Sequence, residues 1–485
     1  MTRIVFVNTP LTAEETAGPL ASAAARVPPL GLVAMASAAA AAGFDARIVD
    51  AANFNLGYDE TVSRILALQP DLVGLTSVTV SIHNAAAIAA RLKKIRPEIV
   101  TVVGGVHVSA APEETMERFP CFDIGVLGEG DETIIDVLAH LEDLDPEKIE
   151  GLVIRKNGGI LRTPPRAPVA DLNALPLSRW DLLPDLARHY RPAMPVIHRL
   201  PSATLMTSRG CPGKCIFCNT GTVSGKHIRA YNPGAMISEI EALVAQYGIR
   251  DLNIYDVNFV ALGRRLADIA ALWTDRGFDL TMSVYARVDD ITEEKLDILK
   301  QMGCRQITFG LESGSQRILD LIRKGFTLDT AAKALALTVR KGISARGLFM
   351  IGHPGETAET IEATLDFLLR TPLDDFHITY FTPLPGTVSY KIAGEYGRFE
   401  ENWEAMSCFR PVYFPWDVNK KLMERKVREA YRRFYFRPRI LKTYLRSLTT
   451  PGGRMKFFLG GRALLASAFS GHRAGAQEKT GRTGR

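Results

Sequence analysis

Three cysteines lie within eight residues of one another in the stretch Arg209–Asn219, RGCPGKCIFCN. Cys211, Cys215 and Cys218 follow the spacing CxxxCxxC, whereas a structural zinc site uses four protein ligands, usually in two pairs. A [4Fe–4S] cluster held by three cysteines leaves one iron open to a substrate or cofactor. The triplet therefore favours an iron–sulfur cluster that does chemistry. In the zinc alternative, the fourth ligand would be His198 or His227.

The cysteine triplet comes directly after the first of six short apolar runs that alternate with helical segments. Six such repeats predict a barrel or a three-quarter barrel, in which chemistry lies at the carboxyl ends of the strands. The triplet falls at such an end. The strands are expected at Ala203–Thr207, Leu252–Asp256, Leu280–Tyr285, Gln306–Gly310, Gly347–Ile351 and Phe376–Phe381.

Residues 1–141 show the same alternation, which is typical of βαβ units around a parallel sheet. It predicts a doubly wound, Rossmann-like domain whose ligand lies at the carboxyl ends of the strands. No GxGxxG follows the first strand, so a nicotinamide dinucleotide is not the expected ligand. The strands are expected at Ile4–Asn8, Ala46–Asp50, Leu72–Ser77, Val100–Gly105 and Ile124–Gly128.

The predicted fold class is thus α/β, with a doubly wound domain, a partial (β/α)6 barrel and a C-terminal helical segment. A hairpin at 151–163 and a proline-rich stretch connect the two domains. The last residues, GHRAGAQEKTGRTGR, are expected to be disordered. The predicted divisions are 1–145 for the first domain, 146–200 for hairpin and linker, 201–390 for the barrel, 391–470 for the helical segment and 471–485 for the tail.

Composition and cysteine usage indicate a cytoplasmic protein. The chain has 485 residues, of which 46% are hydrophobic and 23% charged, and its first residues, MTRIVFVNTP, lack the features of a signal peptide. The longest uncharged apolar run, Gly31–Phe44, is too short to span a bilayer. Six cysteines in a reducing compartment argue against disulfides. Those outside the triplet are expected to be ordinary buried residues, namely Cys121, Cys304 and Cys408.

The motif CPGKCIFC resembles the CxxxCxΦC signature of the radical S-adenosylmethionine (SAM) superfamily, with Phe217 as its aromatic residue. FGLESGS at 309–315, and also YDVNF, FMIGHPGET and TPLPGT, resemble segments that end successive barrel strands in that family. The resemblance covers residues 200–390. It implies that the open iron chelates SAM, which one electron then cleaves to a 5′-deoxyadenosyl radical.

The resemblance also implies roles for individual residues, although it assigns no catalytic side chain. The cluster ligands would be Cys211, Cys215 and Cys218. The residues that contact SAM would be Phe217, Arg287, Gly310, Glu312 and Ser313. A guanidinium suits bidentate pairing with the SAM carboxylate. The alternative for Arg287 and Glu312 is a salt bridge inside the barrel.

The first domain resembles the cobalamin-binding domain of B12-dependent radical enzymes, through PPLGL at 28–32, GGVH at 104–107 and GEGDET at 128–133. Cobalamin is therefore an expected cofactor. The DxHxxG motif that supplies the lower axial histidine elsewhere is absent, so the candidates for that position are His107, His83, water or nothing. The expected cobalamin-binding residues are Thr9, Pro10, Ser77, Thr79, Val80, Gly104, Gly105, His107, Gly128, Glu129 and Gly130.

Two reactions agree with this set of cofactors. The first is C-methylation of an unactivated carbon of a small molecule such as a lipid, a porphyrin or a natural product. The second is an oxidative cyclisation or rearrangement, as in the anaerobic magnesium-protoporphyrin monomethyl ester cyclase, which the chain also resembles. We expect methylation, with a flavodoxin or ferredoxin as electron donor and no nucleic acid as partner.

Two further classes are less compatible with the sequence. Methylthiotransferases that act on transfer RNA carry a second cysteine triplet in their first domain, whereas this chain has only Cys121 before residue 200. A non-enzymatic redox or sensor protein would need neither the barrel nor the SAM motifs.

Basic residues are concentrated near the end of the chain, although the net charge is only +6. Between Lys420 and Arg446 there are eleven Lys or Arg and two Glu. Such a segment could lie on an anionic membrane surface. Alternatively, the aliphatic stems of its arginines could cover the barrel or the interface between domains, and we favour that interpretation.

Overall fold

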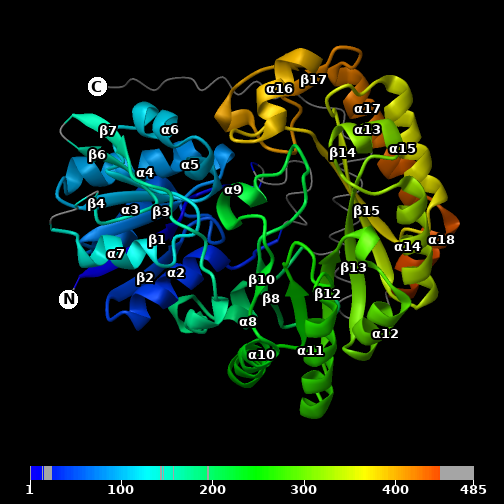
Figure 1. The fold of residues 1–485 in the computed structure, drawn as a ribbon, viewed down its shortest axis with the longest axis horizontal. Helices are drawn as coiled ribbons and strands as arrows, with labels where there is room; N and C mark the ends of the chain where they lie inside the picture. The colour runs from blue at the N-terminus through cyan, green and yellow to red at the C-terminus, as the bar shows by residue number, and fades with distance from the viewer. Residues whose placement is uncertain are drawn as a thin grey trace.

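A computed structural model describes residues 2–13, 15, 25–142, 145, 147–156, 158–193 and 196–447. An amino-terminal lobe and a barrel lie side by side, and a segment near the carboxyl terminus lies above the junction between them in the view of Figure 1. The predicted disordered tail and the end of the predicted helical segment lie outside the described residues. The domain boundaries stay predictions.

The amino-terminal lobe is built on a seven-stranded sheet in the order β2-β1-β3-β4-β5-β6-β7. The first five strands are parallel, as expected, and their ends lie within two residues of the predicted ones. Strand order reverses at β1, which places the topological switch point between β1 and β3. The five strands are β1 (Arg3–Asn8), β2 (Asp45–Asp50), β3 (Leu72–Thr76), β4 (Val100–Gly104) and β5 (Ile124–Val126).

Helices cover both faces of this sheet, which explains why its strands read as continuous apolar runs. Two separate hydrophobic cores lie on its two sides. The helices are α2 (Leu30–Ala41), α3 (Tyr58–Ala67), α4 (Ile82–Ile95), α5 (Val106–Ala110), α6 (Pro112–Arg118) and α7 (Thr133–Ala139), with the 3-10 helix η2 (Thr79–Ser81).

The predicted hairpin extends the first sheet. Its strands β6 (Leu152–Lys156) and β7 (Gly159–Arg162) are antiparallel, and β6 pairs with the edge strand β5. Three successive residues, Leu152 to Ile154, are buried, because they complete the core beside the short strand β5. The linker that follows contains η3 (Leu172–Ala174), η4 (Trp180–Leu182) and α8 (Leu186–His189).

The second sheet has six parallel strands in the order β15-β14-β13-β12-β11-β8, which confirms the partial barrel. The strands are β8 (Ser202–Leu205), β11 (Asp251–Ile254), β12 (Thr281–Ala286), β13 (Cys304–Glu312), β14 (Ser344–Ile351) and β15 (Asp375–Tyr380). The connecting helices are α10 (Pro233–Tyr247), α11 (Gly263–Arg276), α12 (Glu293–Gln301), α13 (Gln316–Leu321), α14 (Leu328–Arg340) and α15 (Ala358–Arg370).

Side-chain caps fix where several barrel helices begin. Asn232 precedes α10 and accepts from the Ala235 amide at 2.7 Å, with Pro233 as the first helical residue. Thr292, Thr327 and Thr357 cap α12, α14 and α15 in the same way. These caps end each strand-to-helix loop at a defined residue, so the loops at the carboxyl ends of the strands keep their shape.

The segment after the barrel only partly matches the helical prediction. Helix α16 (Val388–Tyr396) is followed by a short antiparallel pair, β16 (Gly397–Phe399) and β17 (Tyr413–Pro415), with η7 (Trp403–Ala405) between them. We call residues 397–418 the strap. Trp403 and Met406 of the strap pack in the hydrophobic core that also contains β3 and α4 of the amino-terminal lobe.

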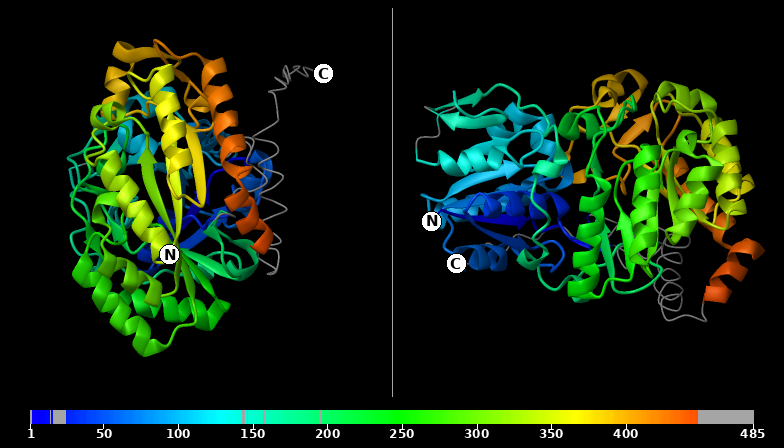
Figure 2. Two further views of the ribbon diagram at one scale, coloured as in Figure 1. Left: turned by 90° about the vertical axis from the view of Figure 1, so that its right-hand side faces the viewer. Right: turned by 60° about the horizontal axis from the view of Figure 1, so that its bottom comes forward.

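The strap is followed by helices α17 (Lys420–Tyr435) and α18 (Pro438–Ser447), at the orange end of the colour scale in Figure 2. Helix α17 packs on the barrel edge, where Tyr431 and Phe434 contact Phe376 of β15. Its Lys426 pairs with Glu429 at 3.0 Å and with Glu362 of α15. These contacts support the interpretation that the basic segment covers the barrel.

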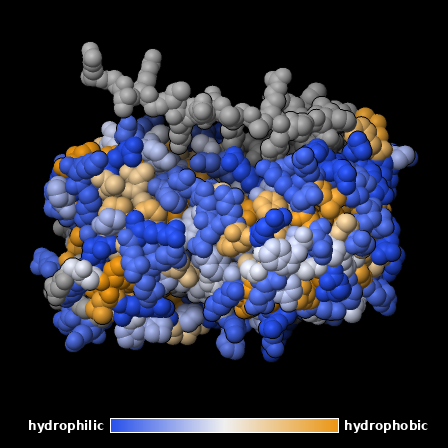
Figure 3. Space-filling view, turned by 90° about the horizontal axis from the view of Figure 1, so that it is seen from above, coloured by the Kyte–Doolittle hydropathy of each residue, from blue (hydrophilic) through white to orange (hydrophobic). Residues whose placement is uncertain are grey.

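The described helices include none with the length and apolarity needed to cross a membrane. On the face seen in Figure 3, hydrophobic residues form small scattered groups among hydrophilic ones, which is ordinary for a surface in contact with water. Contact of the basic segment with a membrane surface stays a prediction.

Candidate functional site

A two-stranded ribbon closes the base of the loop that carries the three cysteines. Strands β9 (Ser208–Arg209) and β10 (Arg229–Ala230) pair antiparallel, and residues 210–228 between them form what we call the cysteine loop. Asp256, fully buried at the end of β11, accepts from the hydroxyls of Thr207 at 2.6 Å and Ser208 at 2.7 Å and from both backbone amides. Burial raises the pKa of Asp256, and these hydrogen bonds oppose the rise. The strand end and the loop are thus tied together.

The three thiols have the surroundings of cluster ligands. The Gly213 amide donates to Cys211 Sγ at 3.4 Å, and the Thr220 amide donates to Cys218 Sγ at the same distance. Hydrogen bonds to the cysteine sulfurs are among the factors that tune iron–sulfur clusters. Burial raises the pKa of Cys215, while the charges of Lys324 and Arg287 oppose that rise. Amide donors and nearby cations therefore suit a cluster held by thiolates.

Of the two histidines of the zinc alternative, one lies away from the cysteine loop and the other contacts it through its backbone. The described residues contain no group of three His, Cys, Asp or Glu side chains spaced for one metal ion, and the thiolates of a cubane bind different irons. His198 lies at the amino-terminal end of the barrel, where its amide donates to Asp251 at 3.2 Å. His227 is exposed, and its backbone carbonyl lies against Gly210.

A buried ion pair lies beside the cysteine loop. Lys324 Nζ is 2.7 Å from Glu312 Oε1 and 5.9 Å from the centroid of the Phe217 ring. A Cβ at Gly310 would lie 2.7 Å from Glu312 Oε1 and 3.0 Å from Lys324 Nζ, so only glycine leaves room for the pair. Glu312 itself has φ +63°, an unusual conformation for glutamate that often marks functional sites. The structure thus brings together three of the predicted SAM residues, Phe217, Gly310 and Glu312.

Of the other two predicted SAM residues, Arg287 reaches the cysteine loop, whereas Ser313 contacts α15. Arg287 reaches the cysteine loop, where its Nη1 would lie 3.8 Å from a Cβ at Gly213, and it pairs with Asp289 at 2.7 Å. Its Nη2 also donates to the carbonyl of Lys324 at 3.1 Å. Ser313 is fully buried, and its hydroxyl is bonded to Thr364 at 3.1 Å. Ser313 therefore fastens the loop to α15 and does not face the site.

Lys324, His353 and Glu356 were not identified from the sequence. His353 is fully buried between Phe217 and Phe381, with ring centroids at 6.3 and 5.4 Å. Burial lowers its pKa to about 4, so the ring is neutral at pH 7. The carboxyl group of Glu356 accepts from the amides of Gly352 and His353 through Oε2, which fixes the turn after β14. No spacing rule identifies these residues, because they reach the site through the packing of different loops.

Glu356 should make stability depend on pH. Burial raises the pKa of its carboxyl to about 8, above its ordinary value of 4.5. The native state therefore holds this proton more tightly than the unfolded state. The stabilisation is complete below pH 4.5 and is lost as pH rises through 8, a change on the order of 5 kcal/mol. Urea unfolding at several pH values should show a flatter profile for Glu356→Gln than for the unchanged protein.

Glu359 provides the matched control for this measurement. It lies exposed in the first turn of α15, where the hydrogen bond with Thr357 lowers its pKa, so it is ionised in both the native and the unfolded state above about pH 6. Glu359→Gln should therefore leave the pH profile of unfolding unchanged between about pH 6 and 8. An identical slope in Glu356→Gln and the unchanged protein between pH 5 and 8 would show that Glu356 is ionised in the native state.

The loops of the amino-terminal lobe are fastened to one another at the carboxyl edge of its sheet. The Thr9 hydroxyl donates to the carbonyl of Thr76 at 3.1 Å, and the Ser77 amide donates to the carbonyl of Gly104 at 2.9 Å. The Gly128 amide donates to Ser109 Oγ at 3.0 Å. The predicted cobalamin-binding residues therefore come from loops that meet at one edge.

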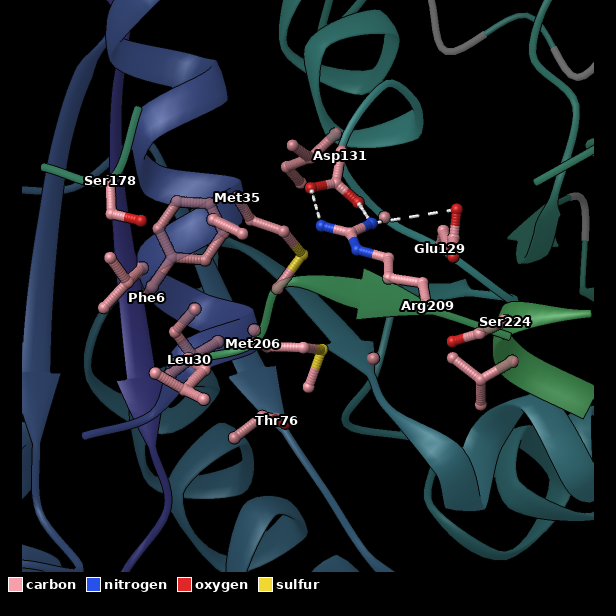
Figure 4. Close-up of a pocket in the computed structure, with 18 of the residues that line it drawn as sticks. Phe6, Leu30, Met35, Thr76, Glu129, Asp131, Ser178, Met206, Arg209 and Ser224 are labelled. Atoms are coloured by element: carbon pink, nitrogen blue, oxygen red, sulfur yellow. Dashed lines mark hydrogen bonds and ion pairs between the residues drawn. The ribbon is translucent and has the colours of Figure 1, made fainter. Parts of the chain in front are cut away.

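A cavity of about 300 Å³ opens beside this edge, between the sheet, α2 and the start of the barrel. Its walls are largely apolar and include Phe6, Leu30, Met35 and Met206, as Figure 4 shows. A binding site of this volume and character suits an organic ligand. Five of the predicted cobalamin residues line it, namely Gly104, Gly105, Gly128, Glu129 and Gly130. The others lie outside its lining, namely Thr9, Pro10, Ser77, Thr79, Val80 and His107.

His107, one of the candidates for the axial position, lies in the short helix α5. It is fully buried, with its ring 4.4 Å from the Trp403 ring of the strap, and its Nδ1 lies 3.2 Å from the Thr79 hydroxyl. Burial lowers its pKa to about 4, assisted by the charges of His83 and Arg118. The strap thus covers His107 with the Trp403 ring. The other candidate, His83, has its Nδ1 3.3 Å from Oε1 of Glu404.

Replacing Gly105 by alanine should disrupt this edge. Gly105 has φ +109°, and a Cβ there would lie 2.4 Å from the carbonyl oxygen of Ser77. Strain and overlap together should cost about 3 kcal/mol of stability. Gly43→Ala is the control, because Gly43 has φ +92° with no heavy atom within 4 Å of a Cβ. In thermal unfolding, Gly105→Ala should melt several degrees lower than Gly43→Ala, and equal melting temperatures would contradict the prediction.

Family models and relatives agree with this architecture. A model of the B12 binding domain matches residues 18–138, and a model of the radical SAM superfamily matches residues 205–368. An uncharacterised methyltransferase of Pyrococcus horikoshii is 33% identical over 85% of this chain and 89% of its own length. The anaerobic magnesium-protoporphyrin IX monomethyl ester cyclase of Rubrivivax gelatinosus is 25% identical over 91% of this chain and 79% of the cyclase.

Solved structures show the same fold. The radical SAM methyltransferase TsrM of Kitasatospora setae, with cobalamin and a [4Fe–4S] cluster bound, has a TM-score of 0.70 and 18% identity, covering 96% of this chain and all of that one. The cobalamin-dependent radical SAM enzyme OxsB has a TM-score of 0.72 and 18% identity, covering 96% of this chain and 72% of its own.

Fold and site together define an enzyme of the radical SAM class that carries a B12-binding domain before its barrel. The chain belongs to the family of cobalamin-dependent radical SAM enzymes. A [4Fe–4S] cluster, SAM and cobalamin are accordingly its cofactors.

Proposed function

We propose that this protein is a methyltransferase that places a methyl group on an unactivated carbon of a small molecule. The observation that carries the proposal is the position of the cysteine loop directly beside the glycine loops of the B12-binding lobe, with the two joined by ion pairs. When bound, the cluster supplies the electron that cleaves SAM, and cobalamin supplies the methyl group. Relatives named methyltransferases support this reaction class.

In this proposal the cysteine loop holds the cluster through Cys211, Cys215 and Cys218. Lys324 and Arg287 provide positive charge beside it, suited to the carboxylate of SAM. Phe217 presents an aromatic face, and Gly310 leaves the space in which Glu312 lies. Buried, neutral His353 closes the site behind Phe217 and helps to exclude water from it.

The glycine loops and the apolar cavity would receive cobalamin. Gly105 lets the backbone lie against Ser77, because a Cβ there would be only 2.4 Å from the Ser77 carbonyl oxygen. The cavity of about 300 Å³ is large and apolar enough for the nucleotide end of a corrinoid. The DxHxxG motif that would supply an axial histidine is absent from the sequence, and His107 is covered by the strap. We therefore infer that cobalamin is held through its periphery.

Methyl-labelled SAM tests the proposal. The protein, reconstituted without oxygen with iron, sulfide and hydroxocobalamin, is reduced and incubated with labelled SAM and a small-molecule extract of its source. We expect 5′-deoxyadenosine together with the label on a carbon of an extract component. Formation of 5′-deoxyadenosine with no label in any product would contradict methyl transfer.

The cyclase reaction is the second candidate, because the cyclase of Rubrivivax gelatinosus aligns with nearly the whole chain. The same experiment separates the two functions, since a cyclase alters its substrate without transferring the label. In either case the reaction needs a low-potential electron donor, for which a flavodoxin or ferredoxin is the expected partner. Cys218 is exposed, which would place one edge of the cluster within reach of such a protein.

A further inference from the structure

Two arginines stand at the base of the cysteine loop, one on each strand of the ribbon. Arg209 and Arg229 are directly opposite each other in the β9–β10 register. Both side chains leave the barrel and reach the loop that follows β5 in the B12-binding lobe. Figure 4 shows Arg209 crossing from the ribbon toward Asp131 and Glu129. The loop between these arginines contains all three cysteines.

Each arginine makes a two-point contact with its own carboxylate. Arg209 Nη1 and Nη2 donate to Asp131 Oδ2 and Oδ1 at 2.7 and 3.0 Å. Arg229 Nη1 and Nη2 donate to Glu129 Oε2 and Oε1 at 2.9 and 2.8 Å. Glu129 also lies 3.7 Å from Arg209, which links the two pairs. Paired donors fix both distance and angle, so these contacts hold the ribbon in one orientation.

These four side chains are buried, and their charges balance. The exposed fraction is 11% for Arg209, 13% for Arg229 and 5% for each carboxylate. Burial lowers the pKa of Arg209, but the hydrogen bond and charge of Asp131 outweigh this effect and raise it overall. A buried ion pair of this kind adds little net stability compared with apolar residues, whereas loss of one member leaves a buried charge. Its main contribution is therefore a defined geometry.

The same residues form part of the cavity wall. Glu129, Asp131 and Arg209 line the cavity together with Gly128 and Gly130. A ligand in the cavity therefore contacts the β5 loop that the two arginines hold. The cysteine loop reaches the same cavity through Val223 and Ser224.

We propose that Arg209, Arg229, Glu129 and Asp131 form a latch that positions the cysteine loop relative to the cobalamin site and couples occupancy of the two. The inference rests on the proposed function in assigning the cavity to cobalamin. These four are positioning residues, since they act through the loops that they join. Because coupling between two sites is reciprocal, a filled cavity should order the cysteine loop, and an assembled cluster should tighten corrinoid binding.

The first test uses the cofactor-free, full-length chain and amide hydrogen exchange. Asp131→Asn removes one charge at nearly constant shape, and Arg209→Lys keeps the charge but loses the two-point contact. Both variants should exchange faster than the unchanged protein in 208–230 and in 124–133. If exchange accelerates in only one of these segments, or in neither, the latch does not join the lobes. This result does not depend on the proposed function.

The second test measures coupling with hydroxocobalamin as the probe. In the unchanged protein, the dissociation constant should fall about fivefold or more when the cluster is assembled. In Arg229→Lys, whose side chain does not line the cavity, the cluster should make less than about a twofold difference, although the cluster-free affinity stays close to that of the unchanged protein. If the contact were purely structural, its loss would weaken hydroxocobalamin binding equally in the cluster-free and the cluster-containing protein. Equal coupling in the variant and the unchanged protein would overturn the proposal.

Arg199 and Asp279 provide the matched control pair. They make a similar two-point contact, at 2.7 and 2.8 Å, away from the cysteine loop, and Asp279 is exposed. Arg199→Lys should change neither the exchange of the cysteine loop nor the coupling. If hydroxocobalamin fails to bind the unchanged protein at all, the assignment of the cavity is wrong, whereas the exchange result still decides whether the latch exists.

Discussion

Replacing Cys215 by alanine should abolish the cleavage of SAM. Two thiolates cannot hold a cubane that leaves one iron for SAM, and the neighbouring Lys324 and Arg287 would then face an empty loop. Iron and sulfide contents after anaerobic reconstitution should fall to background, and 5′-deoxyadenosine should not form under dithionite. Iron analysis and chromatography of the nucleoside measure the two effects.

Cys121→Ala is the control for this experiment. Cys121 is partly buried in the amino-terminal lobe, where its thiol donates to the carbonyl of Ala86 at 3.4 Å. Its replacement should leave both iron content and SAM cleavage intact. A Cys215→Ala protein that still bound four irons and produced 5′-deoxyadenosine would show that the cysteine loop does not hold the cluster.

Replacing Lys324 by methionine should weaken SAM binding about tenfold or more, because a charge-assisted hydrogen bond to a carboxylate is lost. Methionine keeps the length and the apolar stem beside Phe217. It also leaves Glu312 buried without its cation, so the variant should melt at a lower temperature. Equilibrium binding of SAM to the anaerobically reconstituted protein measures the first effect, and thermal unfolding measures the second.

Two further variants separate these effects. The double variant Lys324→Met with Glu312→Gln removes the orphaned charge, so it should recover stability but not SAM affinity. Lys341→Ala removes a lysine that pairs with Glu293 and Asp297 on the outside of the barrel, and it should bind SAM normally. If the double variant bound SAM as tightly as the unchanged protein, Lys324 would serve only to neutralise Glu312.

The parallel strands could be predicted because they are buried on both faces and therefore appear as apolar runs. All eleven predicted strands are present. The hairpin could also be predicted from the sequence. Its pairing with β5 could not, because that pairing depends on the position and length of β5 in the folded sheet. The strap was missed because its buried residues, such as Trp403 and Tyr413, follow neither a helical nor a strand period.

Residues of the site could be predicted only where they lie close together in the sequence. The three cysteines lie in one motif, so they could be identified at once. Lys324 lies 12 residues after Glu312, beyond the turn that follows α13, and only the fold brings the two together. The burial of His107 could not be predicted, for the complementary reason. Its burial comes from Trp403, almost 300 positions later in the chain.

The strap has a practical consequence for anyone who wishes to divide this protein. Its tryptophan lies between His107 and the guanidinium of Arg118, 4.0 Å from the ring, and completes a core made from the first third of the chain. A fragment that stops before residue 397 would leave a hole where the indole belongs and uncover apolar side chains around it. The core of the amino-terminal lobe is therefore completed by residues of the strap, and that lobe can finish folding only after the strap has been synthesised.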